Sequence, residues 1–401
     1  MKRLVIVAAI FACAFFGFQF QASASESCPD RVMWGKTELK QGQIGKVTIL
    51  KNVQSYTLSS SIKPAKLLLK DAEYRVYSYK NGYYGLGGGL FVKKDSSVLY
   101  QTPSKAKLSL LNCQDASVFS VSGITIGTPK ADVERLLGRE KDRQLNEYSS
   151  LWNVYHQNYK NFILISYDKS NKVEGFYTNS GQLKSGSGIT IGTSKADTRD
   201  SLGSPISYIV KGYTRYNLEQ TAEKDYFSIK GNIATVFYDV HNAGKVTAVQ
   251  MLKQEMEERK TGFFGPPTVS LQLAFERTMF DLTNSIRVRN GFGAVTRDML
   301  ADRSARKHSQ DMAEHNFFAH NNLRGETPFT RMTKEGVRYS AAGENIAMGY
   351  YSSIFAHEAL LNSLGHRKNI LDPKWRNLGV GVAFTDKEGL PYYSQNYFTP
   401  K

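Results

Sequence analysis

The chain has 401 residues, of which 41% are apolar and 12% aromatic. This composition excludes a disordered chain, which buries too little apolar surface to offset the entropy of ordering, and the length predicts two to four domains. The 52 Lys and Arg residues exceed the 36 Asp and Glu residues, giving a net charge of +16. Such a surplus indicates an anionic partner, which by composition alone is nucleic acid, a membrane surface or an acidic wall polymer.

The beginning of the chain predicts secretion. Lys2 and Arg3 precede an apolar run over residues 4–18, and the small residues Ala22, Ser23 and Ala24 follow. This order is typical of a signal peptide cleaved after Ala24, and the run is shorter than the roughly 20 residues of a transmembrane helix. We therefore expect an extracellular or cell-wall-associated protein that keeps no transmembrane anchor after cleavage. That location argues against nucleic acid as a partner.

Two cysteines, Cys28 and Cys113, remain after cleavage. In a secreted chain they permit one disulfide that closes a loop around the first module. Two unpaired thiols are the alternative, and the sequence leaves both open.

Residues 25–120 are predicted to form a small, basic, β-rich module. Strand-forming segments lie at 47–50, 74–79 and 90–92, and the glycine run 85–89 predicts a hairpin turn because neither a Walker lysine nor a helix follows it. The pattern loosely resembles bacterial SH3-like modules, which often bind cell-wall material. This module has 14 basic and 7 acidic residues. We expect it to bind an anionic cell-wall polymer or peptidoglycan.

Residues 121–260 contain an internal repeat. Residues 123–138 and 188–203 are identical at 11 of 16 positions. Each copy predicts a strand and then a short helix, which Thr128 or Thr193 caps and Gly138 or Gly203 ends. Paired strands are expected after each helix, at 162–167 with 173–177 and at 233–238 with 246–252.

The remaining residues, 261–401, predict two helices followed by late strands at 378–384 and 392–397. The first helix spans about 270–290 and the second about 298–315. Spacing places these apolar side chains inward: Leu273, Met279, Phe280, Leu282 and Ile286 on the first helix, and Leu300, Ala301, Ala305 and Met312 on the second.

Three ordered motifs lie in this segment: F-x-x-H at 317–320, G-E-N-I-A at 343–347 and N-S-x-G-H-R at 362–367. Together they resemble the CAP superfamily (cysteine-rich secretory protein, antigen 5 and pathogenesis-related 1, also called SCP), in its bacterial secreted branch. The repeats resemble the CAP-associated segment that precedes this domain in Gram-positive secreted proteins. The resemblance implies a multidomain α+β protein whose C-terminal domain is an α–β–α sandwich.

The resemblance also implies a cleft with two histidines and two acids. By motif, these are His320, His366 and Glu344, while Ser363 stands where the second acid is expected. Glu358 on the same predicted helix is about 140° away around the axis, which makes it a poor substitute. Two imidazoles and a carboxylate predict a site for Zn²⁺ or another divalent cation. The alternative is a hydrogen-bonded cluster that organises the cleft without metal.

Three hypotheses for function follow. The first is a non-catalytic envelope protein that binds a metal ion or an unidentified small or lipid ligand. The second is a metal-dependent hydrolase of peptide or wall polymer with Glu344 as its base, and the third is a structural wall or spore component. The missing second acid favours the first. His308, His315 and His357 are expected to be structural or solvated.

Overall fold

The computed structural model of the protein describes residues 32–40, 42–58, 61–108, 119–260 and 262–401. The predicted signal peptide and both Cys28 and Cys113 lie outside these ranges. The chain forms two compact units, residues 1–111 and 112–401. Within the described ranges, no helix is both long and apolar enough to cross a bilayer.

The first unit is built from short strands, as its sequence predicts. A three-stranded sheet has the order β10-β3-β6 and a five-stranded sheet the order β5-β4-β9-β8-β7. The bounds are β1 Met33–Trp34, β2 Thr37–Glu38, β3 Gly45–Ile49, β4 Val53–Leu58, β5 Ile62–Leu68, β6 Glu73–Val76, β7 Ser78–Lys80, β8 Tyr83–Gly87, β9 Leu90–Lys93 and β10 Val98–Gln101. The glycine run makes the predicted hairpin between β8 and β9. The segment predicted as one strand at 74–79 divides into β6 and β7, which belong to different sheets.

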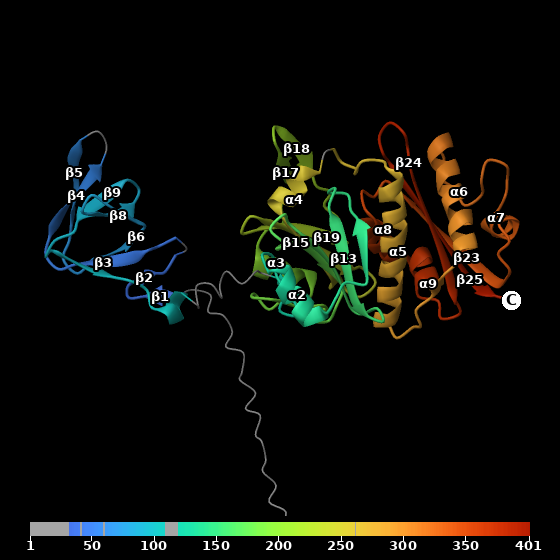
Figure 1. The fold of residues 1–401 in the computed structure, drawn as a ribbon, viewed down its shortest axis with the longest axis horizontal. Helices are drawn as coiled ribbons and strands as arrows, with labels where there is room; N and C mark the ends of the chain where they lie inside the picture. The colour runs from blue at the N-terminus through green and yellow to red at the C-terminus, as the bar shows by residue number, and fades with distance from the viewer. Residues whose placement is uncertain (1–31, 41, 59–60, 109–118, 261) are drawn as a thin grey trace, which may run out of the picture. The chain divides into compact units, whose positions relative to one another are not determined.

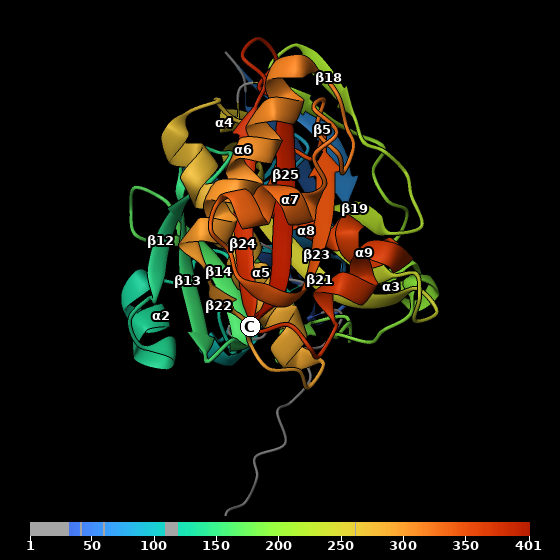
Figure 2. The ribbon, with the colours of Figure 1, turned by 90° about the vertical axis from the view of Figure 1, so that its right-hand side faces the viewer.

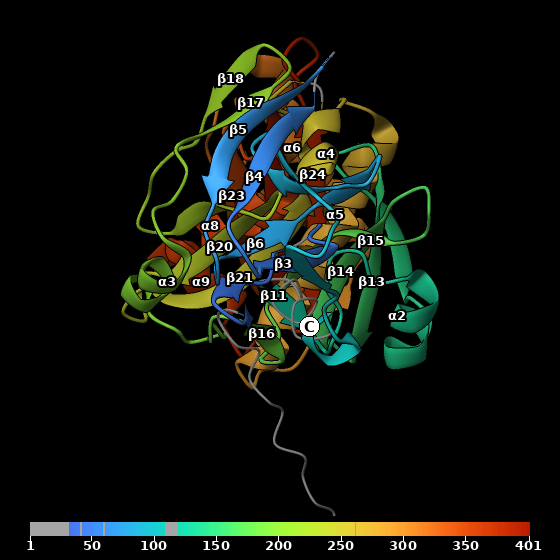
Figure 3. The ribbon, with the colours of Figure 1, turned by 90° about the vertical axis from the view of Figure 1, so that its left-hand side faces the viewer.

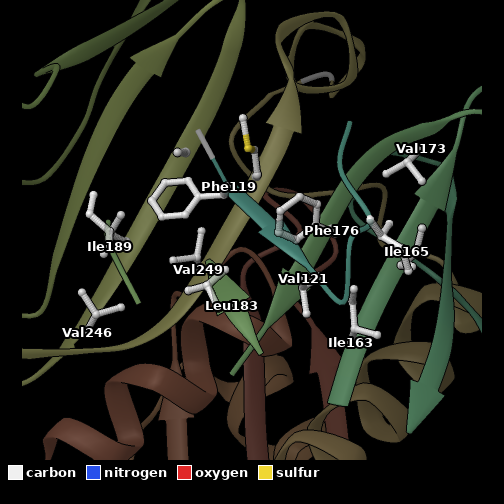
Figure 4. Close-up of a cluster of buried hydrophobic side chains, with 14 of the residues drawn as sticks. Phe119, Val121, Ile163, Ile165, Val173, Phe176, Leu183, Ile189, Val246 and Val249 are labelled. Carbon is white, nitrogen blue, oxygen red and sulfur yellow. The ribbon is translucent and has the colours of Figure 1, made fainter. Parts of the chain in front are cut away.

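The second unit begins with a seven-stranded antiparallel sheet of order β12-β13-β14-β15-β21-β20-β19 (Figure 1). The bounds are β11 Phe119–Val121, β12 Asp142–Leu145, β13 Leu151–Gln157, β14 Lys160–Tyr167, β15 Val173–Thr178, β16 Leu183–Ser185, β17 Tyr208–Lys211, β18 Thr214–Asn217, β19 Lys224–Ile229, β20 Asn232–Asp239 and β21 Lys245–Lys253. The four strands predicted after the repeated helices are β14, β15, β20 and β21, and both predicted pairings are present. Apolar side chains from β11, β14, β15, β16 and β21 converge on one buried cluster (Figure 4).

The repeated segments contain helices α2 Lys130–Leu137 and α3 Lys195–Leu202, which lie on opposite sides of this region (Figures 2 and 3). Both end at the predicted glycines, Gly138 and Gly203. The prediction for the start of each copy is wrong, because 123–127 and 188–192 form turns in which the first and last glycines have positive φ. Glycine adopts this left-handed conformation readily, so an alternating apolar pattern does not extend into a strand there.

The predicted helix caps are also wrong. Pro129 and Ser194 occupy the N-cap positions. The hydroxyls of Thr128 and Thr193 instead accept hydrogen bonds from the amides three residues earlier, Thr125 N at 3.0 Å and Thr190 N at 2.9 Å. The threonines therefore close the turn before each helix.

The chain from α5 (Val269–Arg289) onward forms an α–β–α sandwich around a four-stranded sheet of order β22-β24-β25-β23 (Figure 1). Its elements, with the short helix α4 before it, are α4 Gln254–Arg259, α5 Val269–Arg289, β22 Thr296–Arg297, α6 Met299–His315, α7 Pro328–Lys334, β23 Tyr339–Met348, α8 Ser353–Asn362, α9 Leu364–Ile370, β24 Asn377–Phe384 and β25 Pro391–Pro400. Figure 2 shows α6 and α7 in front of β24 and β25. The two long helices and both late strands match the prediction closely, although Leu273 and Leu300 are 41% and 37% exposed rather than inward. These two leucines lie at the margin of each apolar face, where a helical period alone cannot separate core from rim.

Alternate residues of strand β24 face the two helical layers on opposite sides of the sheet. Leu378, Val380 and Val382 are buried in the cluster that includes α5 residues. Gly379 and Gly381 point the other way, where a Cβ on Gly381 would lie 2.0 Å from the backbone nitrogen of Arg306 on α6. The glycines therefore allow α6 to pack directly on the sheet.

A methyl group at Gly381 is expected to push α6 away from the sheet. We expect Gly381→Ala to lower the free energy of unfolding by about 1–3 kcal/mol, because overpacking forces backbone shifts. Gly365→Ala is the matched control, since among the described residues no atom outside its own helix backbone and its chain neighbours lies within 4 Å of its Cβ position on α9. Urea unfolding measures both. Equal stability of the two variants would contradict the close packing.

The two parts of the second unit share one core. Leu282 of α5 and Phe355 of α8 are buried in the cluster that contains Trp152 and Phe237 of the seven-stranded sheet. Figure 1 shows α5 between the two sheets. Buried hydrogen bonds also join α5 to the region before it. Thr278 of α5 donates to Gln144, and Asn179 donates to Ser285 of α5. The sandwich and the region before it are therefore packed as one body.

Candidate binding cleft

The first histidine of the cleft follows the end of α6. The helix ends at Asn316, which adopts the left-handed conformation with φ 51° and turns the chain out of the helix. His320 lies four residues later and its side chain is 53% exposed. Its Nδ1 is 2.9 Å from Oε1 of Glu344 on β23.

Glu344 is the buried member of this pair, with a side chain only 1% exposed. Its second oxygen, Oε2, accepts a hydrogen bond of 2.6 Å from Nη2 of Arg331 on α7. Nη1 of Arg331 also donates to the carbonyl of His320 at 2.7 Å. Arg331 therefore holds His320 twice, through the backbone and through Glu344.

The second histidine lies on α9, the helix that Ser363 begins. Nδ1 of His366 is 2.8 Å from Oγ of Ser363. Asn345, next to Glu344 on β23, donates to the carbonyl of His366 at 3.2 Å, and Asn369 of α9 donates to the carbonyl of Glu344 at 3.2 Å. These amides fix α9 against β23, so the pair Ser363–His366 is set beside the pair Glu344–His320.

The surroundings of His366 favour its neutral form. Burial lowers the pKa of His366, and the neighbouring charge of His320 lowers it further. Burial likewise lowers the pKa of His308, whose Nε2 faces the carbonyl of Ala319 at 3.0 Å. No carboxylate is hydrogen-bonded to His366 in the described chain, because Ser363 offers a neutral hydroxyl.

The structure places the four predicted residues in two hydrogen-bonded pairs, His320 with Glu344 and Ser363 with His366. It does not bring Glu358 to them, as the helical spacing predicts: Glu358 is buried and accepts a 2.6 Å hydrogen bond from Tyr177. His308 and His357 are buried, and His315 is exposed beside Asp311.

Each cleft histidine has its Nδ1 occupied and no hydrogen bond to its Nε2 among the described residues. Two such nitrogens suit Zn²⁺ or a similar cation, with Glu344 orienting His320 in the manner of a carboxylate behind a metal-binding histidine. Within the described ranges, no group of three or more His, Cys, Asp or Glu side chains is arranged to hold a metal ion. Both oxygens of Glu344 are already bonded, one of them to a guanidinium, so the Nε2 atoms of the two histidines are the remaining candidate donors.

Sequence reasoning did not identify Arg331, Asn345 or Asn369. Arg331 is one of many charged residues, and its neighbours along the chain do not indicate that its side chain is buried, only 8% exposed. Asn345 stood inside a recognised motif but had no assigned role. Polar residues that are buried by tertiary contacts leave no signal in a single sequence.

Restoring the second acid is expected to change the protonation of His366. Ser363→Asp should raise the pKa of His366 by about one unit or more, because a carboxylate stabilises the imidazolium. Ser363→Asn is the neutral control of the same shape. An NMR titration of the histidine ring protons measures both, and an equal shift in the two variants would contradict the assigned pairing.

The family models match the two halves of the second unit. The CAP-associated N-terminal model matches residues 126–263, and the model described as the cysteine-rich secretory protein family, CAP, matches residues 280–397. The uncharacterized protein YkwD and the uncharacterized membrane protein YlbC, both of Bacillus subtilis, are 39% identical over 127 residues, 32% of this chain. The match spans about half the length of YkwD, 48%, and 35% of YlbC.

Solved structures extend the similarity to both halves. An extracellular protein containing an SCP domain from Bacillus anthracis is 25% identical with a TM-score of 0.58, over 68% of this chain and 93% of that one. A cysteine-rich secretory protein from Staphylococcus aureus shares the fold at 17% identity and a TM-score of 0.52, over 70% and 95%. This chain is thus related to bacterial extracellular SCP proteins: its C-terminal domain belongs to the cysteine-rich secretory protein (CAP) family, and a CAP-associated N-terminal region precedes it.

Proposed function

We propose that this protein is a secreted, envelope-associated binding protein whose CAP cleft holds a ligand or a divalent cation without catalysing a reaction. The single observation that carries the proposal is the pairing of His366 with the hydroxyl of Ser363 at 2.8 Å. A hydroxyl cannot stabilise a protonated imidazole as a carboxylate does, so the cleft lacks a second charged acid–base pair.

The state of Glu344 supports the same conclusion. A general base must lie within hydrogen-bond reach of the water that it deprotonates. Both carboxylate oxygens are bonded, one to His320 and one to Arg331, and the side chain is almost fully buried. Glu344 is therefore suited to orient His320 rather than to act as the base of a hydrolase.

The hydrolase alternative is tested by turnover. We expect the mature chain, supplied with Zn²⁺, to release no product from casein or from muropeptides. Glu344→Gln is the matched control, because it removes the carboxylate and keeps the shape. Product that the wild type releases and Glu344→Gln does not would overturn the non-catalytic assignment.

The first unit is the proposed point of attachment to the envelope. Strand β5, at the edge of the five-stranded sheet, exposes six of its seven residues. Lys63, Lys66 and Lys70 lie on it or just after it, and none is ion-paired among the described residues. Unpaired lysines on an edge strand suit an anionic wall polymer.

Attachment is expected to depend on this unit and on salt. Deleting residues 25–120 should release the protein from isolated cell walls. Added salt should also release the full mature chain, because salt screens the attraction between its lysines and the anionic polymer. Sedimentation of walls with bound protein measures both. Retention that survives the deletion would place the attachment elsewhere in the chain.

A further inference from the structure

A second pocket lies at the seam between the CAP-associated region and the CAP domain. It has a volume of about 310 Å³. The end of β20 contributes Asp239 and the turn after it His241, while Arg289 lies at the end of α5, Glu358 on α8 and Arg367 on α9. No residue of the His320–Glu344 pair lines it. It is therefore distinct from the cleft described above.

Arg289 provides a cation with unused hydrogen-bonding capacity. Its Nη1 donates to the carbonyl of Thr247 at 2.6 Å and to the hydroxyl of the same residue at 3.3 Å. No group in the described chain accepts a hydrogen bond from its Nε or Nη2. A guanidinium that is anchored through one nitrogen and free at the others is positioned to bind a carboxylate with two parallel hydrogen bonds.

Glu358 provides an acceptor with unused capacity. The residue is 3% exposed, and its Oε1 accepts a hydrogen bond from Tyr177 at 2.6 Å. Its Oε2 has no hydrogen-bond partner among the described residues. An unbonded buried carboxylate oxygen is costly to the folded chain, so a donor group brought by a ligand would relieve that cost.

The walls of the pocket are held in place by contacts between the two regions. Arg367 donates to Asp239 at 2.8 Å. The side-chain oxygen of Asn362 accepts a hydrogen bond from the amide of Val240 at 3.0 Å, and its side-chain nitrogen donates to the carbonyl of Tyr238 at 2.9 Å. Binding would therefore require little ordering of the protein, which favours affinity for a small ligand.

The charges that face the pocket select the class of ligand. Arg289 and Arg367 are positive, whereas Asp239 and Glu358 are acidic. Arg367 and Asp239 are paired with each other, so Arg289 and Glu358 are the groups left for a ligand, and a molecule with a carboxylate and an amino group contacts both. We propose that this seam pocket binds a small zwitterion, an amino acid or the end of a short peptide, with its carboxylate on Arg289 and its amino group toward Glu358.

The test is calorimetric titration of the full mature chain with alanyl-alanine, with acetate and with methylammonium. We expect saturable binding of the dipeptide, with acetate and methylammonium at least about tenfold weaker, because each makes half of the contacts. Arg289→Gln should weaken dipeptide binding by about tenfold or more. Arg135→Gln, on the exposed face of α2, and His320→Ala, in the cleft, should leave it unchanged.

Three results would overturn the proposal. They are no saturable binding of the dipeptide by the wild type, binding of acetate as tight as the dipeptide, and full binding by a folded Arg289→Gln variant. If Arg289→Gln fails to fold, Arg289→Lys replaces it. This variant keeps the charge but loses the two-nitrogen geometry, so unchanged binding by Arg289→Lys would equally overturn the assignment.

Discussion

Replacing Arg331 by methionine is expected to lower the free energy of unfolding by about 3–5 kcal/mol, because removing one partner of a buried ion pair leaves an uncompensated charge. The charge is that of Glu344, whose side chain is 1% exposed and whose Oε2 lies 2.6 Å from the guanidinium. The variant also loses hydrogen bonds to the carbonyls of His320 and Glu326. Urea unfolding measures the loss.

Two comparisons separate the charge effect from general damage. Arg324→Met removes an arginine that is 71% exposed and paired with Glu326, so it should cost less than about 1 kcal/mol. Adding Glu344→Gln to Arg331→Met removes the stranded charge and should recover part of the loss. An Arg331→Met variant as stable as Arg324→Met would contradict the view that this pair organises the cleft.

Acidification is expected to unfold the protein partly through His357. This residue is fully buried, neither ring nitrogen has a hydrogen-bond partner among the described residues, and burial lowers its pKa to about 3. The unfolded chain has an ordinary histidine pKa of about 6.5 and so binds a proton first as the pH falls. The stability is intact above pH ~6.5 and declines below it by up to about 1.4 kcal/mol per pH unit, or about 4–5 kcal/mol by pH ~3.

His357→Leu isolates this contribution. Burial raises the pKa of both Glu147 and Glu358 to about 7, so these groups titrate in the same range with the opposite sign. The difference in unfolding free energy between wild type and variant cancels them. We expect the free energy of unfolding of the variant, relative to that of the wild type, to rise by about 2–3 kcal/mol as the pH falls from 7 to 4.5. His315→Leu, at an exposed histidine, should show no such gain. A difference between wild type and His357→Leu that does not change with pH would contradict the burial of this imidazole.

The sequence predicted those elements whose period or spacing is local. Helices α5 and α6 matched to within one or two residues, because an apolar face at every third and fourth position is a local pattern. The start of each repeated segment was predicted wrongly, since I-T-I alternates like a strand while the flanking glycines close a turn. Register between distant segments and the shared core of the two regions depend on tertiary contacts, which a single sequence does not display.

The cleft shows the same division. The motifs identified His320, Glu344, Ser363 and His366, including the missing acid, and the structure adds what each one contacts. The roles of Arg331 and of the amides of Asn345 and Asn369 depend on tertiary contacts and could be assigned only from the structure. The seam pocket could not be expected from the sequence, because Arg289 lies in a segment predicted only as a helix and Glu358 was considered only as a substitute for the second acid of the cleft.

Zinc titration by calorimetry tests the proposed cleft most directly. We expect the mature wild-type chain to bind Zn²⁺ and His320→Ala/His366→Ala to weaken the binding by at least about tenfold, because both nitrogen donors are lost. His315→Ala is the matched control, since His315 and His320 are both 53% exposed. Its binding should equal that of the wild type. Binding by the double variant as tight as by the wild type, or no binding by the wild type, would contradict the assignment of the two imidazoles as cation ligands.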